Sequence, residues 1–439
     1  MKLEGKSLKH DFFRFIIPSL MAQWVYALYT MVDGLFVARG VSELALSGVN
    51  IAMPFLTLLF SVALLFAVGS STMIAILLGQ KKEKKAQEVF TQNIVMASIV
   101  SILIMGMTLW KSREIALFLG ATDLTITYVQ TYLNTIACFS IFFVCSYSLE
   151  VLVKTDGYPM KATMFVVAGA VLNCILDYLF VIQLHKGVWG AAFATGISQF
   201  SVVVLYLTHF CSRKTHMKFV KFIPSFPLLC RTVKTGLSSG ITELSPGIVI
   251  FLYNHAILTF LNEEAVVSYT IVTYVSAIVV MSMVGITQGI QPLVSYHYGR
   301  KSVGQYHRLL KYALYFGTIF SIAAFAVSRM LAKPLVNLFV SPEFGNLRVE
   351  SVRIFSIVSY SFLLCGCNII LGGFFTAVEH PKASMSISLG RGVLFVAISL
   401  WILTAIFQGE GIWWAAVLSE GLCFVLTLIL SLSYKRQIG

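Results

Sequence analysis

The sequence predicts an all-α polytopic membrane protein with twelve transmembrane helices, arranged as two parallel, pseudo-symmetric lobes of six helices each, with both termini in the cytoplasm. Three observations support this prediction. Hydrophobic residues make up 58% of the 439 residues and charged residues only 12%, whereas soluble domains average about 45–50% and about 25%. Basic residues are concentrated in alternate loops. The two halves of the chain also carry matching residues at a nearly constant spacing.

Apolar segments of about 20 residues or more, each sufficient for one helical crossing of a bilayer, recur along the whole chain. The alternating pattern of a membrane-spanning barrel is absent, so we expect helices to satisfy the backbone in lipid. The predicted spans are residues 12–38, 44–78, 89–110, 126–151, 162–183, 189–210, 235–261, 265–297, 309–330, 352–378, 383–407 and 411–433. The second and eighth are long enough to be tilted or to extend beyond the bilayer.

The distribution of Lys and Arg predicts the orientation. With the N-terminus inside, the inner loops and adjacent span ends hold 23 of the 32 basic residues, the outer ones hold 8, and Arg391 lies within a span. Cytoplasmic loops of membrane proteins carry such an excess. The bias predicts a plasma or inner membrane protein with both termini cytoplasmic. It also accounts for the net charge of +13 without nucleic acid as a partner.

The two halves of the chain are related by an offset of about 220 residues. Matching residues include Glu43 with Glu263, Ala45 with Ala265, Gly69 with Gly289, and Lys81 with Lys301. Because each half has an even number of spans, both enter the membrane in the same direction, related by an axis along the membrane normal. We therefore predict an N-terminal lobe at 1–210, a cytoplasmic inter-lobe loop at 211–234 and a C-terminal lobe at 235–439. A cleft between two such lobes suits alternating access.

The first, fifth and sixth spans place polar residues at one depth. Asp33, Asp177 and Thr195 each lie five or six residues from the outer end of a span, or about 8–10 Å at about 1.5 Å per residue. Asn173 precedes Asp177 by four residues and shares its helix face. Two carboxylates, an amide and a hydroxyl suit a Na⁺ ion, and paired carboxylates also suit a proton. We predict a cation-coupling site from these four residues; the alternative is that each forms separate packing hydrogen bonds.

Further polar residues are candidates for the substrate cleft. Asp33 ends a polar stripe on the first span, in which Gln23, Tyr26, Tyr29 and Thr30 share its face at about 100° per residue. Glu243 lies in the Gly- and Pro-containing stretch GLSSGITELSPG, where a broken helix would line a transport site. It would hold a cationic substrate or a proton, or else only cap or hydrogen-bond near the inner end. The predicted cleft residues are Gln23, Tyr29, Glu243 and Asn254.

For other ionisable residues within or near spans we predict structural roles and no part in transport. We expect Arg391 to pair with Glu420 across the last two spans, because intramembrane charges usually find partners. Glu150 lies close to the inner end of its span, so we expect its carboxylate to be in contact with solvent.

Signatures of catalysis and nucleotide binding are absent from the sequence. It contains no phosphate-binding loop, no His-Glu-x-x-His and no nucleophile elbow. We therefore expect that the protein is not an enzyme and binds no cofactor. The energy for its activity would come from an ion gradient or from another subunit. A membrane-embedded enzyme is the least favoured alternative.

Five segments carry a resemblance to a known family: IIPSLMAQWVYALYTMVDGLFV, VGSSTMIAILLGQKKEKKAQEVF, LNCILDYLFV, GVWGAAFATGISQ and GIQPLVSYHYGRK. In their order and spacing the chain resembles the multidrug and toxic compound extrusion (MATE) transporters over nearly its full length. The resemblance implies a monomer in the lipid bilayer that exports small amphipathic, often cationic, organic compounds against a Na⁺ or H⁺ gradient.

The resemblance also implies site residues. It places the cation site in the N-terminal lobe, at Asp33, Asn173, Asp177 and Thr195, with Tyr132 of the fourth span. The NorM-type branch carries an acid in span ten, whereas this span reads IFSIVSYSFLLCGCNIILGGFFTAV, so a C-lobe cation site of that type is not expected. The alternative function on the same fold is a flippase or exporter of a lipid-linked or metabolite cargo. The mostly acidic intramembrane charges favour cationic cargo.

Overall fold

The computed structural model describes residues 7–213, 215–340 and 343–438, and every regular element within these ranges is a helix. Eleven helices are long and apolar enough to cross a membrane. A twelfth crossing is made by two helices, Ile126–Cys138 and Ser140–Thr155, which meet at an angle of 56°. The predicted all-helical membrane fold is confirmed.

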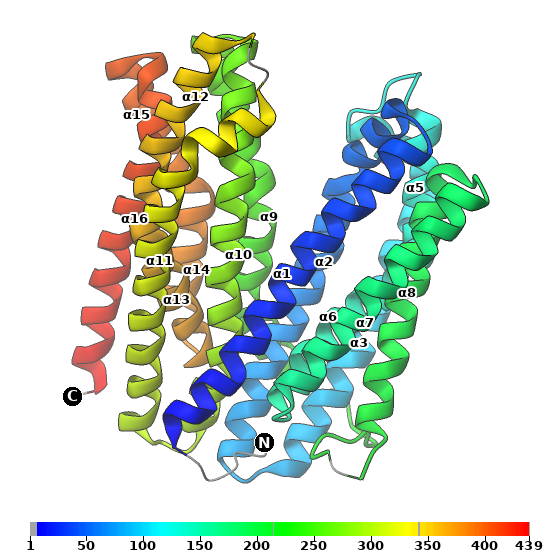
Figure 1. Cartoon of the computed structure of the whole chain (residues 1–439). Coiled ribbons are helices and arrows are strands. Elements are labelled where there is room, and N and C mark those ends of the chain that lie inside the picture. The colour runs from blue at the N-terminus through cyan, green and yellow to red at the C-terminus, as the bar shows by residue number, and fades with distance from the viewer. Residues whose placement is uncertain (1–6, 214, 341–342, 439) are drawn as a thin grey trace.

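The first six spans form the N-terminal lobe, drawn from blue to green in Figure 1. Its helices are α1 (Leu8–Gly40), α2 (Glu43–Gly79), α3 (Glu83–Trp110), the short α4 (Ser112–Phe118), α5 (Ile126–Cys138), α6 (Ser140–Thr155), α7 (Pro159–Asp177), the π-helical turn η1 (Tyr178–Gln183) and α8 (Gly187–Phe210).

The last six spans form the C-terminal lobe, drawn from green to red in Figure 1. Its helices are α9 (Phe226–Phe260), α10 (Glu263–Gly299), α11 (Val303–Phe339), α12 (Gly345–Val358), the 3₁₀ turn η2 (Ser359–Ser361), α13 (Phe362–Ala377), α14 (Pro381–Leu389), the π-helical turn η3 (Gly390–Leu394), α15 (Phe395–Phe407) and α16 (Gly409–Ile438). Helix α9 begins inside the segment 211–234 that we expected to be loop.

The repeat seen in the sequence reappears in local structure at the same offset. Ser42 caps α2, accepting a hydrogen bond from the backbone N–H of Ala45 at 3.0 Å. Asn262, 220 residues later, caps α10 and accepts from the N–H of Ala265 at 3.0 Å. Both side chains satisfy a helix N–H that would otherwise lack a partner. The turns after α2 and α10 also match, because Lys81 and Lys301 both adopt left-handed φ values, of 61° and 57°.

The two lobes approach each other at the end of the bundle that carries both termini, called the inner end below, and diverge toward the opposite end (Figure 1). One close contact involves Gly236 of α9, where an added Cβ would overlap the carbonyl of Leu65 on α2. Gly69 of α2 faces the carbonyl of Thr232 on α9 just as closely. Glycine lets the two backbones touch at these positions, so the inner end is closed.

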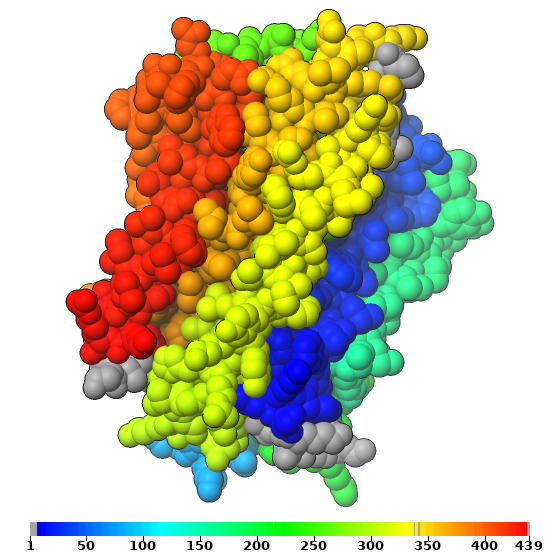
Figure 2. Space-filling view, turned by 60° about the vertical axis from the view of Figure 1, so that its left-hand side comes forward, coloured from blue at the N-terminus to red at the C-terminus, as the bar shows by residue number. Residues whose placement is uncertain are grey.

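Helix α1 belongs to the first lobe, but its inner half packs into the core of the second. Phe12 lies edge-on to Tyr312 and Phe316 of α11, with ring centroids 5.6 and 6.4 Å apart. Figure 2 shows α11 crossing this face diagonally with the start of α1 beside its lower part. Farther along α1, Gln23 Nε2 donates to Gln288 Oε1 of α10 at 3.1 Å. Helix α1 therefore packs against helices of both lobes.

Replacing Gly236 with Ala is expected to disfavour the closed inner end, because the added Cβ collides with backbone rather than with a movable side chain. The matched control is Gly247→Ala on the same helix, where nothing lies within 4 Å of the added Cβ. Spin labels at the exposed Lys84 and Gln305 would report the inner-end separation by pulsed electron resonance. We expect a longer-distance population in Gly236→Ala only; equal distributions in both variants would contradict the role of this contact.

Candidate functional site

Two carboxyl groups meet in the interior of the N-terminal lobe, far along the chain from each other. Asp33 lies on the outer half of α1, and Asp177 is the last residue of α7, directly before the π-helical turn η1. Their residues are 6% and 0% exposed, and the two carboxyl groups interact directly with each other. A π-helical turn widens the helix and is frequent at functional sites.

An amide and a hydroxyl complete this group. Asn173, one turn before Asp177, donates from Nδ2 to Oγ1 of Thr195 on α8 at 3.4 Å. The Thr195 hydroxyl in turn donates to the carbonyl of Ala191 at 2.9 Å. The structure therefore brings together, from α1, α7 and α8, the four residues for which the sequence predicts a common depth.

Several oxygens of this cluster have no hydrogen-bond donor within the part of the chain that the structure describes. They are Asp33 Oδ1, Asn173 Oδ1 and both carboxylate oxygens of Asp177. Within the described part of the chain, no Lys, Arg or His forms an ion pair with Asp33 or Asp177. Buried carboxylates without a partner are strongly disfavoured. The cluster therefore suits a cation or a proton that comes from outside the protein.

The donor set of the cluster consists of oxygen atoms. Its ligands are all oxygens, which hard cations prefer, but only two of them come from acidic residues. Among the described residues, no group of three or more His, Cys, Asp or Glu side chains is arranged to hold a metal ion. Two carboxylates with neutral oxygens around them fit Na⁺, and one shared proton fits them equally well.

Tyrosines and a small cavity surround the cluster. Tyr132 is buried on α5 and lies within electrostatic range of both Asp33 and Asp177, and so does Tyr29 of α1. A small cavity is lined by Asn173, Thr195 and Tyr26. Tyr29, which we expected in the substrate cleft, also lines this cavity.

A buried ion pair lies on the inner side of the same lobe, and the sequence interpretation missed it. Glu150 and Lys154 of α6 are each 1% exposed, with Lys154 Nζ 2.6 Å from Glu150 Oε1. The expectation that Glu150 contacts solvent is wrong, because this end of α6 is enclosed by other helices of the lobe. The available signal was a Glu and a Lys four residues apart in an apolar segment, a spacing that places them on one helix face.

The two six-span halves each match the model of a known protein family. The family model MatE matches residues 18–179 and, separately, residues 248–402. The chain belongs to the MATE family. Each match covers most of one lobe, and the family consists of transporters, so this chain is a transporter and not an enzyme.

Individual relatives of this MATE transporter match almost its whole length. The "Multidrug export protein MepA" of Staphylococcus aureus (strain MSSA476) is 23% identical over 421 residues, covering 95% of this chain and 92% of MepA. The protein of the same name from Staphylococcus haemolyticus (strain JCSC1435) is 22% identical over 437 residues, covering 99% of this chain and 96% of the relative.

Solved structures share the fold of this MATE transporter. A MATE protein in complex with MaL6 superposes with a TM-score of 0.92 at 20% identity, covering 98% of both chains. A multidrug resistance MATE transporter of the MOP superfamily was solved in an outward-facing conformation. It superposes with a TM-score of 0.91 at 20% identity, covering 98% of this chain and 97% of that chain.

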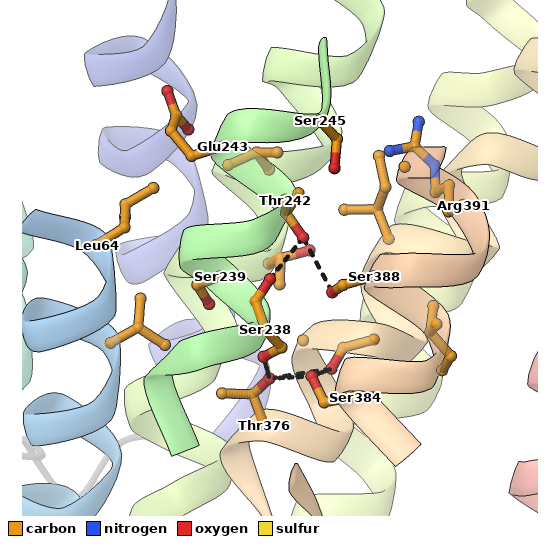
Figure 3. A pocket seen from close by; sticks show the side chains of 18 of the residues that line it. Leu64, Ser238, Ser239, Thr242, Glu243, Ser245, Thr376, Ser384, Ser388 and Arg391 are labelled. Atoms are coloured by element: carbon orange, nitrogen blue, oxygen red, sulfur yellow. Dashed lines mark hydrogen bonds between the residues drawn. The ribbon is translucent and has the colours of Figure 1, made fainter. Parts of the chain in front are cut away.

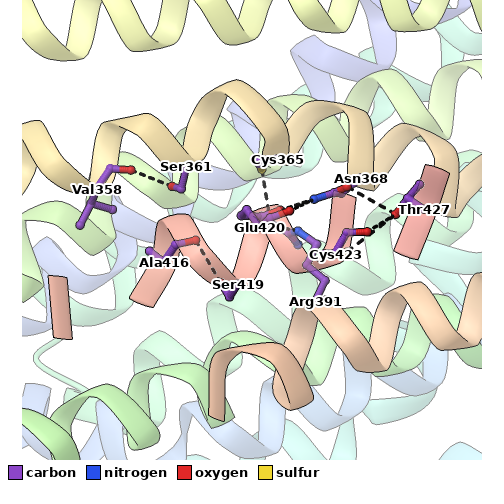
Figure 4. A network of polar contacts seen from close by, with 10 residues as sticks. All are labelled: Val358, Ser361, Cys365, Asn368, Arg391, Ala416, Ser419, Glu420, Cys423 and Thr427. Carbon is purple, nitrogen blue, oxygen red and sulfur yellow. Dashed lines mark hydrogen bonds and ion pairs between the residues drawn. The ribbon is translucent and has the colours of Figure 1, made fainter. Parts of the chain in front are cut away.

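The C-terminal lobe of this MATE transporter also contains an acidic residue within its spans, Glu420, which is paired with a basic residue of the same lobe (Figure 4). Arg391 Nε donates to Glu420 Oε1 at 2.9 Å, which confirms the expected pair. Asn368 Nδ2 of α13 donates to Glu420 Oε2 at 2.7 Å. The Arg391 guanidinium also lies 3.3 Å from Cys365 Sγ. Glu420 therefore has a counter-charge within its own lobe, whereas Asp33 and Asp177 have none among the residues that the structure describes.

A larger cavity adjoins this group and lies between α9, α10, α13 and α14, with a wall from α2. Hydroxyl groups line its inner part in Figure 3, where Ser238 and Thr376 lie 3.1 Å apart and Thr242 donates to Ser388 at 3.0 Å. Glu243 and Arg391 lie on opposite sides of it.

The predicted cleft residues lie in different surroundings. Glu243 lines the larger cavity, and Gln23 bridges the lobes through Gln288. Asn254 is partly exposed on α9 and lines neither cavity. The structure thus groups the predicted cation residues closely and distributes the predicted cleft residues.

Proposed function

We propose that this MATE transporter is a secondary active exporter that exchanges small amphipathic, often cationic, organic compounds for Na⁺ or H⁺ by alternating access. The coupling ion binds in the N-terminal lobe between Asp33 and Asp177, with Asn173, Thr195 and Tyr132 around it. The protein acts as a monomer in the cell membrane.

The unpartnered carboxyl pair carries this proposal. Two buried acids with no cationic partner among the described residues are stable only when a proton or a cation neutralises them. Binding and release of that ion change the charge of the lobe interior. A ligand shifts a conformational equilibrium by its different affinity for the two states, so the ion biases the lobes between inner-open and inner-closed arrangements.

The cargo is inferred from charge and from the relatives. Arg391 is neutralised by Glu420, whereas Glu243, which lines the same cavity, has no ion-pair partner among the described residues. The accessible charge of the cavity is therefore acidic and favours cationic cargo over phosphate-bearing lipids. The MepA proteins are named for multidrug export, which agrees with this preference.

The orientation follows from the basic residues. We place the inner end in the cytoplasm because the loops at that end hold most of the Lys and Arg residues. With this orientation, the closed inner end corresponds to an outward-facing arrangement, in agreement with the outward-facing relative that shares the fold.

Purified protein in liposomes, with Na⁺ and H⁺ gradients imposed separately, tests this function. Ethidium is a suitable probe because it is a small amphipathic cation. We expect an inward-directed gradient of at least one of the two ions to drive ethidium out against its own gradient. Ethidium movement that is equally fast without any ion gradient would contradict secondary active exchange.

A further inference from the structure

The ion pair Glu150–Lys154 has no part in the coupling site, yet it lies buried in the same lobe. Besides Lys154, the Glu150 carboxylate accepts a hydrogen bond from the Tyr26 hydroxyl at 2.8 Å. A buried ion pair is costly to desolvate, and neutral groups of similar size often give equal or greater stability. Its presence inside a transporter lobe therefore points to a role beyond stability.

Polar side chains line a small cavity in the region between this pair and the coupling site. The small cavity of the lobe is lined by Tyr26, Asn173, Thr195, Ser198 and Gln199, together with apolar residues of α7 and α8. Tyr26 then contacts Glu150 directly. Asn173 lies one helical turn from Asp177, so the cavity borders both the coupling site and Tyr26, the hydrogen-bond partner of Glu150.

The pair also lies next to the contact that must open during transport. Tyr26 is three residues from Gln23, which bonds Gln288 of the opposite lobe. Lys154 is the last residue but one of α6, and its neighbour Thr155 has its hydroxyl 2.7 Å from that of Ser71 on α2. Helix α2 forms the close inner contact with α9. The pair therefore lies beside the helix of its own lobe that separates from α9 when the inner end opens.

We propose that Glu150 and Lys154, reached from Asp177 through the small cavity and Tyr26, form the inner exit for the coupling cation; this inference rests on the proposed function. The Glu150 carboxylate attracts the cation as it leaves Asp177. The Lys154 ammonium, 2.6 Å from that carboxylate, repels the cation and keeps its residence short. A conducting site has to bind strongly enough for entry and weakly enough for release, and this pair of opposite charges meets both requirements.

The double variant Glu150→Gln with Lys154→Met tests the exit directly, because it removes both charges and keeps similar volumes. Two transport modes are compared in liposomes: ion-driven ethidium efflux, which requires ion release, and ethidium–ethidium counterflow, which does not. We expect ion-driven efflux to fall about tenfold or more, the range of a typical coupling energy. Counterflow and the thermal unfolding midpoint should match those of the unmodified protein.

A control double variant at an exposed ion pair and a single substitution of Tyr26 accompany the double variant of Glu150 and Lys154. Lys111 and Glu114 form an exposed pair of the same residue types, with Nζ and Oε1 2.9 Å apart, and the variant Lys111→Met with Glu114→Gln should transport normally in both modes. Tyr26→Phe removes only the hydroxyl that links the cavity to Glu150, and should also slow ion-driven efflux selectively.

Two results would overturn the proposal. Ion-driven efflux at the unmodified rate in the double variant would show that the pair is only structural. Equal loss of efflux and counterflow in a folded double variant would place the defect outside ion release. Neither result bears on the coupling site itself, since that site is tested separately by substitution of Asp177.

Discussion

Replacing Asp177 with Asn is expected to abolish ion-driven ethidium efflux while leaving the protein folded in the membrane. Asn keeps the size of the side chain but cannot carry the charge that a coupling ion neutralises. Both carboxylate oxygens of Asp177 lack a donor among the described residues, so the substitution removes no hydrogen bond within that part of the chain. Efflux in the imposed-gradient liposomes should therefore fall to the level of protein-free liposomes.

The control for this variant is Asp123→Asn, because Asp123 is exposed in the connection between α4 and α5. It should transport like the unmodified protein. Ion-driven efflux by Asp177→Asn at the rate of this control would show that the carboxyl pair does not couple the two fluxes.

Replacing Arg391 with Met is expected to destabilise the C-terminal lobe. The change removes the guanidinium and leaves the Glu420 carboxylate with Asn368 as its remaining side-chain partner. Breaking a buried pair by removing one partner costs about 3–5 kcal/mol. We expect a clear decrease in the unfolding midpoint of the detergent-purified protein, and recovery of most of it when Glu420→Gln is added.

Arg353→Met provides the comparison, because Arg353 pairs with Glu410 at the protein surface, where both side chains are about half exposed. Exposed ion pairs contribute about 0–1 kcal/mol. If Arg391→Met and Arg353→Met lowered the midpoint equally, the interpretation of Arg391–Glu420 as a buried structural pair would be wrong.

The positions of the proposed coupling residues were predictable because they depend only on the limits of the spans and on the rise of a helix. Hydropathy locates the spans, and the fixed rise of an α-helix converts a position along a span into a depth. Asp33, Asp177 and Thr195 were detectable in this way because polar residues are rare in apolar segments. The repeat at an offset of 220 was detectable for a similar reason, since loop residues such as Glu43 and Glu263 are not required by hydropathy.

Other features depend on packing that hydropathy does not report. The π-helical turn η1 directly after Asp177 and the 56° bend between α5 and α6 arise in segments whose composition is that of ordinary spans. The start of α9 at Phe226 lies in a segment with basic residues, which the charge pattern assigns to a loop. The burial of Glu150 depends on which helices cover the end of α6, and no local pattern specifies that.

Ethidium binding to the detergent-purified protein as a function of coupling-ion concentration tests the central claim most directly. If ion and substrate oppose each other through the N-terminal lobe, ethidium affinity should fall as the ion saturates its site, by about 5- to 150-fold for a typical coupling energy. In Asp177→Asn the affinity should no longer depend on the ion. An unchanged ion dependence in that variant would contradict the assignment of the coupling site to Asp33 and Asp177.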